Sequence, residues 1–100
     1  MGDFLDVLAR DARKTIDREY YETVKPAERV RISLMKAILE SKANPIITEI
    51  KTASPSAGVI RTNVKAGIIA KAMAKGGATA ISVLTEPIHF SGSLEALTEA

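Results

Sequence analysis

The fold is decided by residues 46–84, which open with Ile46-Ile47-Thr48-Glu49-Ile50-Lys51, a run rich in β-branched residues and too short for a good helix. Residues 78–84 form a second short run, nearly all apolar, as expected for a strand covered on both faces. Between the two runs, residues 64–75 have apolar side chains at helical spacing and end at Gly76-Gly77, a typical helix terminus. Strand, helix and strand together predict a βαβ unit with two parallel strands.

Helices are expected on both sides of this unit. Residues 3–21 repeat an apolar side chain every four positions, as in Phe4, Leu8, Ala12 and Ile16. A second helix is predicted from about Pro26, a residue tolerated in a first helical turn, to about residue 41. A last helix is expected to begin near residue 93, and residues 52–63 and 85–92 are expected to be loops. We therefore divide the chain into a helical extension, residues 1–43, and a β/α part, residues 44–100.

Two parallel strands cannot form a stable sheet alone, because both outer edges keep unpaired backbone N–H and C=O groups. The sequence therefore describes the start of a larger parallel α/β fold, and this conclusion depends on pattern alone.

The composition argues against several classes of function. Lys and Arg total 14 against 12 Asp and Glu, the charges alternate in sign, and only four residues are aromatic, so no nucleic-acid footprint is predicted. The chain has no cysteine and one histidine, which excludes a disulfide framework, a thiolate metal site and a multi-histidine site. No signal-peptide pattern and no membrane-length apolar run are found, so we expect a cytoplasmic protein without a membrane partner.

Glu49 and Lys51 are the first candidates for chemistry. Residues two apart in a strand face the same way, so both charges leave one face near the carboxyl end of the strand, where α/β folds place their sites. A salt bridge on an exposed strand would give the same pattern, and the residues alone leave both interpretations open.

Two loops add further candidates. Ser54-Pro55-Ser56-Ala57-Gly58 could hold two hydroxyls toward a phosphate or a sugar, or form a plain turn. Phe90 could form a wall for an aromatic substrate, or plug the space beneath the next helix. His89 has no identifiable orienting partner, and we expect it to be solvated and inert.

Taken together, these motifs resemble one family, the indole-3-glycerol phosphate synthases. Residues 45–58 are similar to its first-strand signature, an apolar strand running into E-x-K-x-x-S-P-S, and residues 77–93 are similar to its second, G-A-x-A-I-S-V-L-T-E followed by F-x-G-S. The family also has a helical extension before its barrel. The resemblance covers the whole chain and implies the start of a (β/α)₈ TIM barrel with an N-terminal two-helix extension, truncated after the second strand.

The resemblance also implies a reaction and roles. The family converts 1-(2-carboxyphenylamino)-1-deoxyribulose 5-phosphate to indole-3-glycerol phosphate in tryptophan biosynthesis, with ring closure and loss of carbon dioxide and water. Lys51 would hold an anionic end of the substrate and act in proton transfer to the leaving hydroxyl, and Glu49 would orient that lysine. Ser54 matches a substrate-binding serine, and Pro55 and Phe90 match positions that line the pocket of the aromatic ring. No metal or organic cofactor is implied.

The chain departs from the family pattern in two places: residues 61–66 lack the usual acidic and proline residues, and Thr48 stands where alanine is commoner. The family needs further groups on its third, fourth and later strands, and phosphate-binding loops after the seventh and eighth. We therefore expect negligible activity from this chain alone. Two alternatives remain: a non-catalytic fragment that self-associates or complements a partner chain, and another phosphate-binding barrel enzyme of the same pathway, against which the paired motifs argue.

Overall fold

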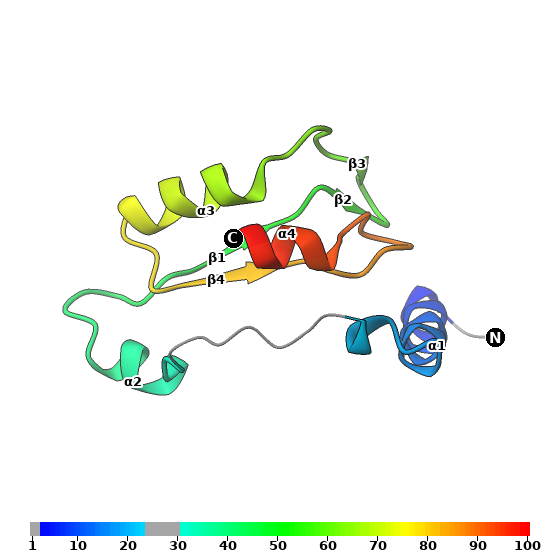
Figure 1. Ribbon diagram of the computed structural model, residues 1–100, viewed down its shortest axis with the longest axis horizontal. Coiled ribbons are helices and arrows are strands. Elements are labelled where there is room, and N and C mark those ends of the chain that lie inside the picture. The colour runs from blue at the N-terminus through cyan, green and yellow to red at the C-terminus, as the bar shows by residue number, and fades with distance from the viewer. Residues whose placement is uncertain (1–2, 24–30) are drawn as a thin grey trace.

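The computed structural model of the chain describes residues 3–23 and 31–100 (Figure 1). The helices are α1 (Phe4–Asp17), the 3₁₀ turn η1 (Tyr20–Glu22), α2 (Leu34–Leu39), α3 (Ala66–Lys75) and α4 (Leu94–Glu99), and the strands are β1 (Ile47–Ile50), β2 (Ala53–Ser54), β3 (Gly58–Val59) and β4 (Ala80–Val83). The order along the chain places one crossover helix, α3, between β1 and β4.

The predicted βαβ unit is confirmed. Strands β1 and β4 pair in parallel, with Ile47 opposite Ala80 and Ile50 opposite Val83. Helix α3 packs on both strands, and α4 packs on α3 (Figure 1). Ile50 is 5% exposed and forms the core with Ala66 and Ala70, whereas Ile47 on the opposite face is 54% exposed. The sheet is therefore covered on one face only within the described chain.

The C-terminal end of α3 and the start of α4 follow the predicted local chemistry. Gly77, directly after the Gly76 cap, adopts a φ of 105°, a backbone conformation that residues other than glycine rarely take. The Ser93 hydroxyl accepts a hydrogen bond from the Ala96 N–H at 3.1 Å and caps α4. Helix α3 itself begins at Ala66, two residues later than predicted.

The first helix is shorter than predicted. Asp3 and Asp6 cap its start reciprocally, each side chain accepting the backbone N–H of the other. The helix ends at Asp17, because Glu19 takes a left-handed φ of 59°, and the separate turn η1 follows. The prediction of one helix over residues 3–21 was therefore wrong at its C-terminal end.

The predicted second helix is also shorter. Pro26 and residues 24–30 as a whole lie outside the described residues. In the described part, α2 begins only at Leu34, because Ser33 has an extended backbone and its hydroxyl accepts the Lys36 N–H at 3.2 Å. Residues 31–33 are not helical, which corrects the prediction of a continuous helix from Pro26 to residue 41.

The loop predicted over residues 52–63 contains a small antiparallel hairpin. Ala53 pairs with Val59 and Ser54 with Gly58, and Gly58 takes a φ of 65° where the chain turns back. The backbone N–H groups of Ile60 and Arg61 then donate to the Thr52 carbonyl at 2.8 and 3.1 Å. These bonds fold the segment back over the end of β1.

The chain exposes more surface than a self-contained folded protein of its size. It exposes 8085 Å² of surface, whereas a self-contained folded protein of its mass exposes about 5,500 Å². Large apolar side chains on and around α2 are among the most exposed, with Ile32 at 84% and Leu39 at 76%. In the part of the chain that the structure describes, no helix has the length and apolar character needed to span a membrane.

Candidate active site

Glu49 and Lys51 lie together at the carboxyl end of β1, as the strand alternation predicts. Lys51 Nζ is 3.1 Å from Glu49 Oε1, and both side chains are partly exposed. The Ser82 hydroxyl on β4 donates to Glu49 Oε2 at 3.2 Å, because the parallel register places Ser82 opposite Glu49. An exposed ion pair of this kind contributes only about 0–1 kcal/mol to stability. The pair therefore fixes the direction of a carboxylate and an ammonium more than it holds the fold together.

The face that carries this pair is the uncovered face of the sheet. Ile50 points toward α3 and is buried, so its neighbours Glu49 and Lys51 leave the strand on the other side. A carboxylate and an ammonium group are therefore exposed on that face, where a ligand can contact them.

Phe90 is brought beside Lys51. Its ring centroid is 6.0 Å from Lys51 Nζ, at the outer limit of a cation–π contact. The Thr52 hydroxyl lies 3.2 Å from the carbonyl oxygens of both Phe90 and Ser91. This hydroxyl, next to Lys51 in the chain, ties the loop after β4 to the end of β1.

Ser54 and Pro55, the other predicted substrate-binding residues, belong to the hairpin. The Ser54 hydroxyl accepts the Ala57 N–H at 3.1 Å and lies 3.4 Å from the Ser56 hydroxyl, so it caps its own turn. Pro55 is exposed at the tip of the hairpin. The hydrogen bonds described for Ser54 are all local, and none of them joins it to Glu49 or Lys51.

Glu86 organises the loop that carries Phe90, a role that the sequence analysis did not assign. Its carboxylate accepts the backbone N–H groups of Ile88 at 3.0 Å, His89 at 2.6 Å and Phe90 at 3.0 Å. The available signal was an acidic residue followed by proline in a polar loop, since such side chains bind nearby backbone N–H groups.

The prediction that His89 is solvated and without an orienting partner was wrong. His89 Nε2 lies 2.8 Å from Asp11 Oδ2, and the two side chains are only 17% and 15% exposed. The hydrogen bond from His89 lowers the pKa of Asp11; the positive charges of Arg10 and Lys14 act the same way, and burial opposes them. Because an ionised carboxylate only accepts, the imidazole donates its Nε2–H. Asp11 precedes His89 by 78 residues, so no local pattern could reveal the pair.

A second contact joins the N-terminal part to the same loop. The Tyr20 hydroxyl donates to the Thr85 carbonyl oxygen at 2.9 Å. Burial raises the pKa of Tyr20 above its ordinary value, so the phenol keeps its proton and remains a donor at neutral pH. The turn η1 thus contributes to holding the loop in place.

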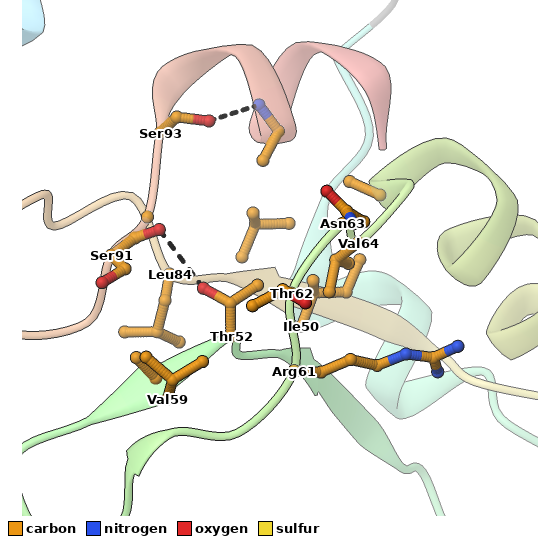
Figure 2. A pocket seen from close by; sticks show the side chains of 15 residues that line it. Ile50, Thr52, Val59, Arg61, Thr62, Asn63, Val64, Leu84, Ser91 and Ser93 are labelled. Atoms are coloured by element: carbon orange, nitrogen blue, oxygen red, sulfur yellow. Dashed lines mark hydrogen bonds between the residues drawn. The ribbon is translucent and has the colours of Figure 1, made fainter.

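A cavity of about 480 Å³ lies near these residues but is not their site. It opens between the end of β1, the segment before α3 and the segment before α4, and Figure 2 shows Thr52, Arg61, Asn63, Ser91 and Ser93 around it. Two of its hydroxyls are already used: Ser93 caps α4, and Thr52 binds the Ser91 carbonyl (Figure 2). Glu49, Lys51 and Phe90 do not line it. The candidate active site is therefore the open sheet face.

No described residues form a metal centre: within residues 3–23 and 31–100, no group of three or more potential ligand side chains is placed to hold an ion.

Comparisons with known proteins all point to one family. The family model described as indole-3-glycerol phosphate synthase matches residues 5–100. The indole-3-glycerol phosphate synthase of Salinibacter ruber is 40% identical over 99 residues, covering 91% of this chain and 36% of the relative. That of Methanocaldococcus jannaschii is 51% identical over 76 residues, covering 70% and 28%, and that of Koribacter versatilis is 40% identical over 100 residues, covering 96% and 38%. The chain thus spans between 28% and 38% of the length of these curated relatives.

Proposed function

This chain belongs to the indole-3-glycerol phosphate synthase family, and on that premise we propose that it forms the first two β/α units of a (β/α)₈ barrel and one wall of its active site. The reaction is conversion of 1-(2-carboxyphenylamino)-1-deoxyribulose 5-phosphate to indole-3-glycerol phosphate, with ring closure and release of carbon dioxide and water. Residues 1–43 are the helical extension that precedes the barrel in this proposal.

The observation that carries the proposal is the position of Glu49, Lys51 and Phe90. In a (β/α)₈ barrel the helices lie outside, and the active site forms at the carboxyl ends of the strands. Helix α3 covers one face of the β1–β4 pair, so the opposite face is the barrel interior. Glu49 and Lys51 leave β1 on that face and at that end, and Phe90 stands on the loop after β4.

The geometry suits the chemistry assigned to these side chains. The Lys51 ammonium offers three donors to an anionic group of the substrate and carries a proton for the leaving hydroxyl. Glu49, fixed by the Ser82 hydroxyl on one oxygen, holds the ammonium with its other oxygen. The Phe90 ring, with Pro55 from the hairpin, forms the wall for the aromatic ring of the substrate, and Ser54 is assigned to substrate binding by the family resemblance.

This arrangement supplies part of a catalytic site. Acid–base catalysis needs its groups within hydrogen-bond reach of the substrate from several sides. In a barrel of this family the remaining groups and the phosphate-binding loops come from later strands. We therefore expect no turnover from residues 1–100 by themselves.

A second candidate function is favoured by the open sheet. Each strand of the β1–β4 pair has one edge unpaired within the described chain, and Ile46 and Ile47 are 57% and 54% exposed. A chain with such edges can pair with a complementary fragment or with itself without catalysing anything. Light scattering coupled to size-exclusion chromatography distinguishes these states, since a concentration-dependent dimer supports self-pairing and a monomer at all concentrations contradicts it.

The catalytic proposal is tested with a chimeric barrel. Residues 1–100 replace the aligned segment of the Salinibacter ruber relative, and product formation is followed by the absorbance of the new indole ring. The relative and the chimera are first compared by circular dichroism and thermal unfolding. A folded chimera that forms indole-3-glycerol phosphate supports the proposal. A chimera that folds as well as the relative but forms no product would falsify it.

A further inference from the structure

The structure assigns a function to a contact between the N-terminal helix α1 and the loop of residues 85–92, here called the rim loop. Asp11 and His89 form a positioning pair that docks α1 on the rim loop. This docking sets the place of Phe90 beside Lys51. This inference rests on the proposed function, because Phe90 matters for catalysis only if it meets substrate. Neither Asp11 nor His89 is assigned any contact with substrate.

The docking contact is built from several side chains. The 2.8 Å hydrogen bond between His89 and Asp11 is its polar centre. The Phe4 ring meets the imidazole edge to face, with centroids 5.6 Å apart and planes at 85°. Tyr20, beyond the end of α1, donates to Thr85 at the other end of the rim loop. The contact is therefore specific in geometry, and its polar centre is largely shielded from water, with His89 and Asp11 17% and 15% exposed.

The position of His89 is transmitted to Phe90 through the backbone. The two residues are consecutive, and the Glu86 carboxylate accepts the N–H groups of both. The Phe90 carbonyl oxygen in turn accepts a hydrogen bond from the hydroxyl of Thr52, which is the residue after Lys51. Loss of the bond to Asp11 would leave this small hydrogen-bonded unit, and the Phe90 ring that it carries, without its side-chain anchor on α1.

The charges around the pair favour an ionised Asp11. Arg10 Nε and Lys14 Nζ lie 3.5 and 3.7 Å from Asp11 Oδ1, leaving Oδ2 for the imidazole. On the side of the rim loop, the Glu86 carboxylate accepts the His89 backbone N–H and is also occupied by the N–H groups of Ile88 and Phe90. The carboxylate of Asp11 is thus held in place from three directions, and it orients the ring.

The first arm of the test is nuclear magnetic resonance on the chimeric barrel, with the isotope label confined to residues 1–100. His89 is the one histidine in the 100-residue sequence, so the labelled imidazole signals can be assigned to it directly. The variant is Asp11→Ala, and the matched control is Asp17→Ala, which removes a carboxylate from the same helix where it pairs with Arg13 at 3.4 Å. The readouts are the amide signals of the rim loop and the nuclear Overhauser contacts between the Phe90 ring and the Lys51 side chain.

We expect Asp11→Ala to shift the imidazole and rim-loop signals and to weaken the Phe90–Lys51 contacts, with Asp17→Ala leaving both unchanged. Asp11→Asn, which keeps an acceptor for the imidazole, should restore part of the contacts. Intact Phe90–Lys51 contacts in Asp11→Ala would overturn the inference. So would general loss of the amide signals of β1 and β4, because the pair would then support the whole unit and not one loop.

The second arm places the same variants in the chimeric barrel. Asp11→Ala should raise KM by at least about threefold and change kcat less, as expected when binding is lost without loss of the reacting groups. Equal kinetics for Asp11→Ala and Asp17→Ala would contradict the positioning role. If the unsubstituted chimera is inactive, the proposed function fails, and the resonance arm still decides whether the pair places Phe90.

Discussion

Phe90 is the residue whose proposed role is easiest to separate from a packing role. Its ring centroid lies 6.0 Å from the Lys51 ammonium. In the chimeric barrel we expect Phe90→Ala to raise KM by about tenfold with a smaller change in kcat, because the lost ring surface binds the substrate ring. Phe90→Leu, which keeps an apolar side chain, is the matched control. Its KM should lie between the KM of the unsubstituted chimera and that of Phe90→Ala. An unchanged KM together with a lower melting temperature would favour the interpretation of Phe90 as a hydrophobic plug.

Gly92 is required by a close approach of two backbone segments. A Cβ at this position would clash with the Leu84 carbonyl oxygen and would lie 2.6 Å from the Leu84 carbonyl carbon. Because both atoms are backbone, Gly92→Ala must displace the rim loop, and we expect a loss of about 1–3 kcal/mol in the free energy of unfolding of the chimeric barrel. Gly76→Ala, where a Cβ meets only ordinary contacts, is the control. Equal urea midpoints for the two variants would contradict this account.

The Asp11 carboxyl gives a pH-dependent prediction. Its pKa is lowered in the folded chain, first by the His89 hydrogen bond. A carboxyl whose pKa falls on folding stabilises the folded state above its unfolded pKa, near pH 4, and this contribution is lost as the pH falls through the folded pKa. In His89→Ala the pKa of Asp11 should rise toward the ordinary aspartate value. Titration of the Asp11 carboxyl carbon by nuclear magnetic resonance measures it, and an unchanged pKa would show that His89 is not the main cause.

At the residue scale, the sequence predicted contacts between near neighbours and missed those between distant ones. Strand alternation was enough to place Glu49 and Lys51 on one face. The bond from Ser82 depends on the register of two strands, and the bond from His89 to Asp11 depends on where α1 docks. Register and docking are properties of the packed chain, and no local pattern encodes them.

At the scale of elements, α4 depends on its cap. It is six residues long and has Ser93 as its N-cap, with Ala96 packed against the core. Replacing a capping serine by alanine costs about 1 kcal/mol, and a helix this short has few internal hydrogen bonds to offset the loss. We expect Ser93→Ala to lower the free energy of unfolding of the chimeric barrel by about that amount. Ser93→Asp, which keeps an acceptor, should not, and equal losses in both variants would exclude capping as the cause.

The elements that the sequence predicted well are those with a long pattern. Strand β1 lies in a run rich in β-branched residues, β4 in an apolar run and α3 in a stretch with helical spacing, and the three elements and the parallel pairing of the strands are confirmed. The end of α1 was missed because a single left-handed residue, Glu19, decides it. The strands β2 and β3 have two residues each, too few for any period to be recognised.

At the scale of the whole molecule, the chain is less compact than a self-contained domain of its length. Its radius of gyration is 15.4 Å, against about 13 Å for a compact domain of 100 residues. The uncovered face of the β1–β4 pair and the exposed apolar residues of α2 are the surfaces that further barrel strands would cover in the proposed fold. The sequence predicted this openness because two parallel strands leave both sheet edges unpaired. It could not predict how the N-terminal helices meet the rim loop, since that contact joins segments far apart in the chain.

The central claim, that the open face of β1 is one wall of an indole-forming site, is tested most directly by kcat of the chimeric barrel with Lys51→Ala. Lys71→Ala, which removes an exposed lysine from α3 on the outer side, is the matched control. We predict that Lys51→Ala lowers kcat by about 100-fold or more, the scale of a lost acid–base group, while its circular dichroism and melting temperature match those of Lys71→Ala. A kcat within about twofold of the control would contradict the role of Lys51 and, with it, the assignment of this face as the active site.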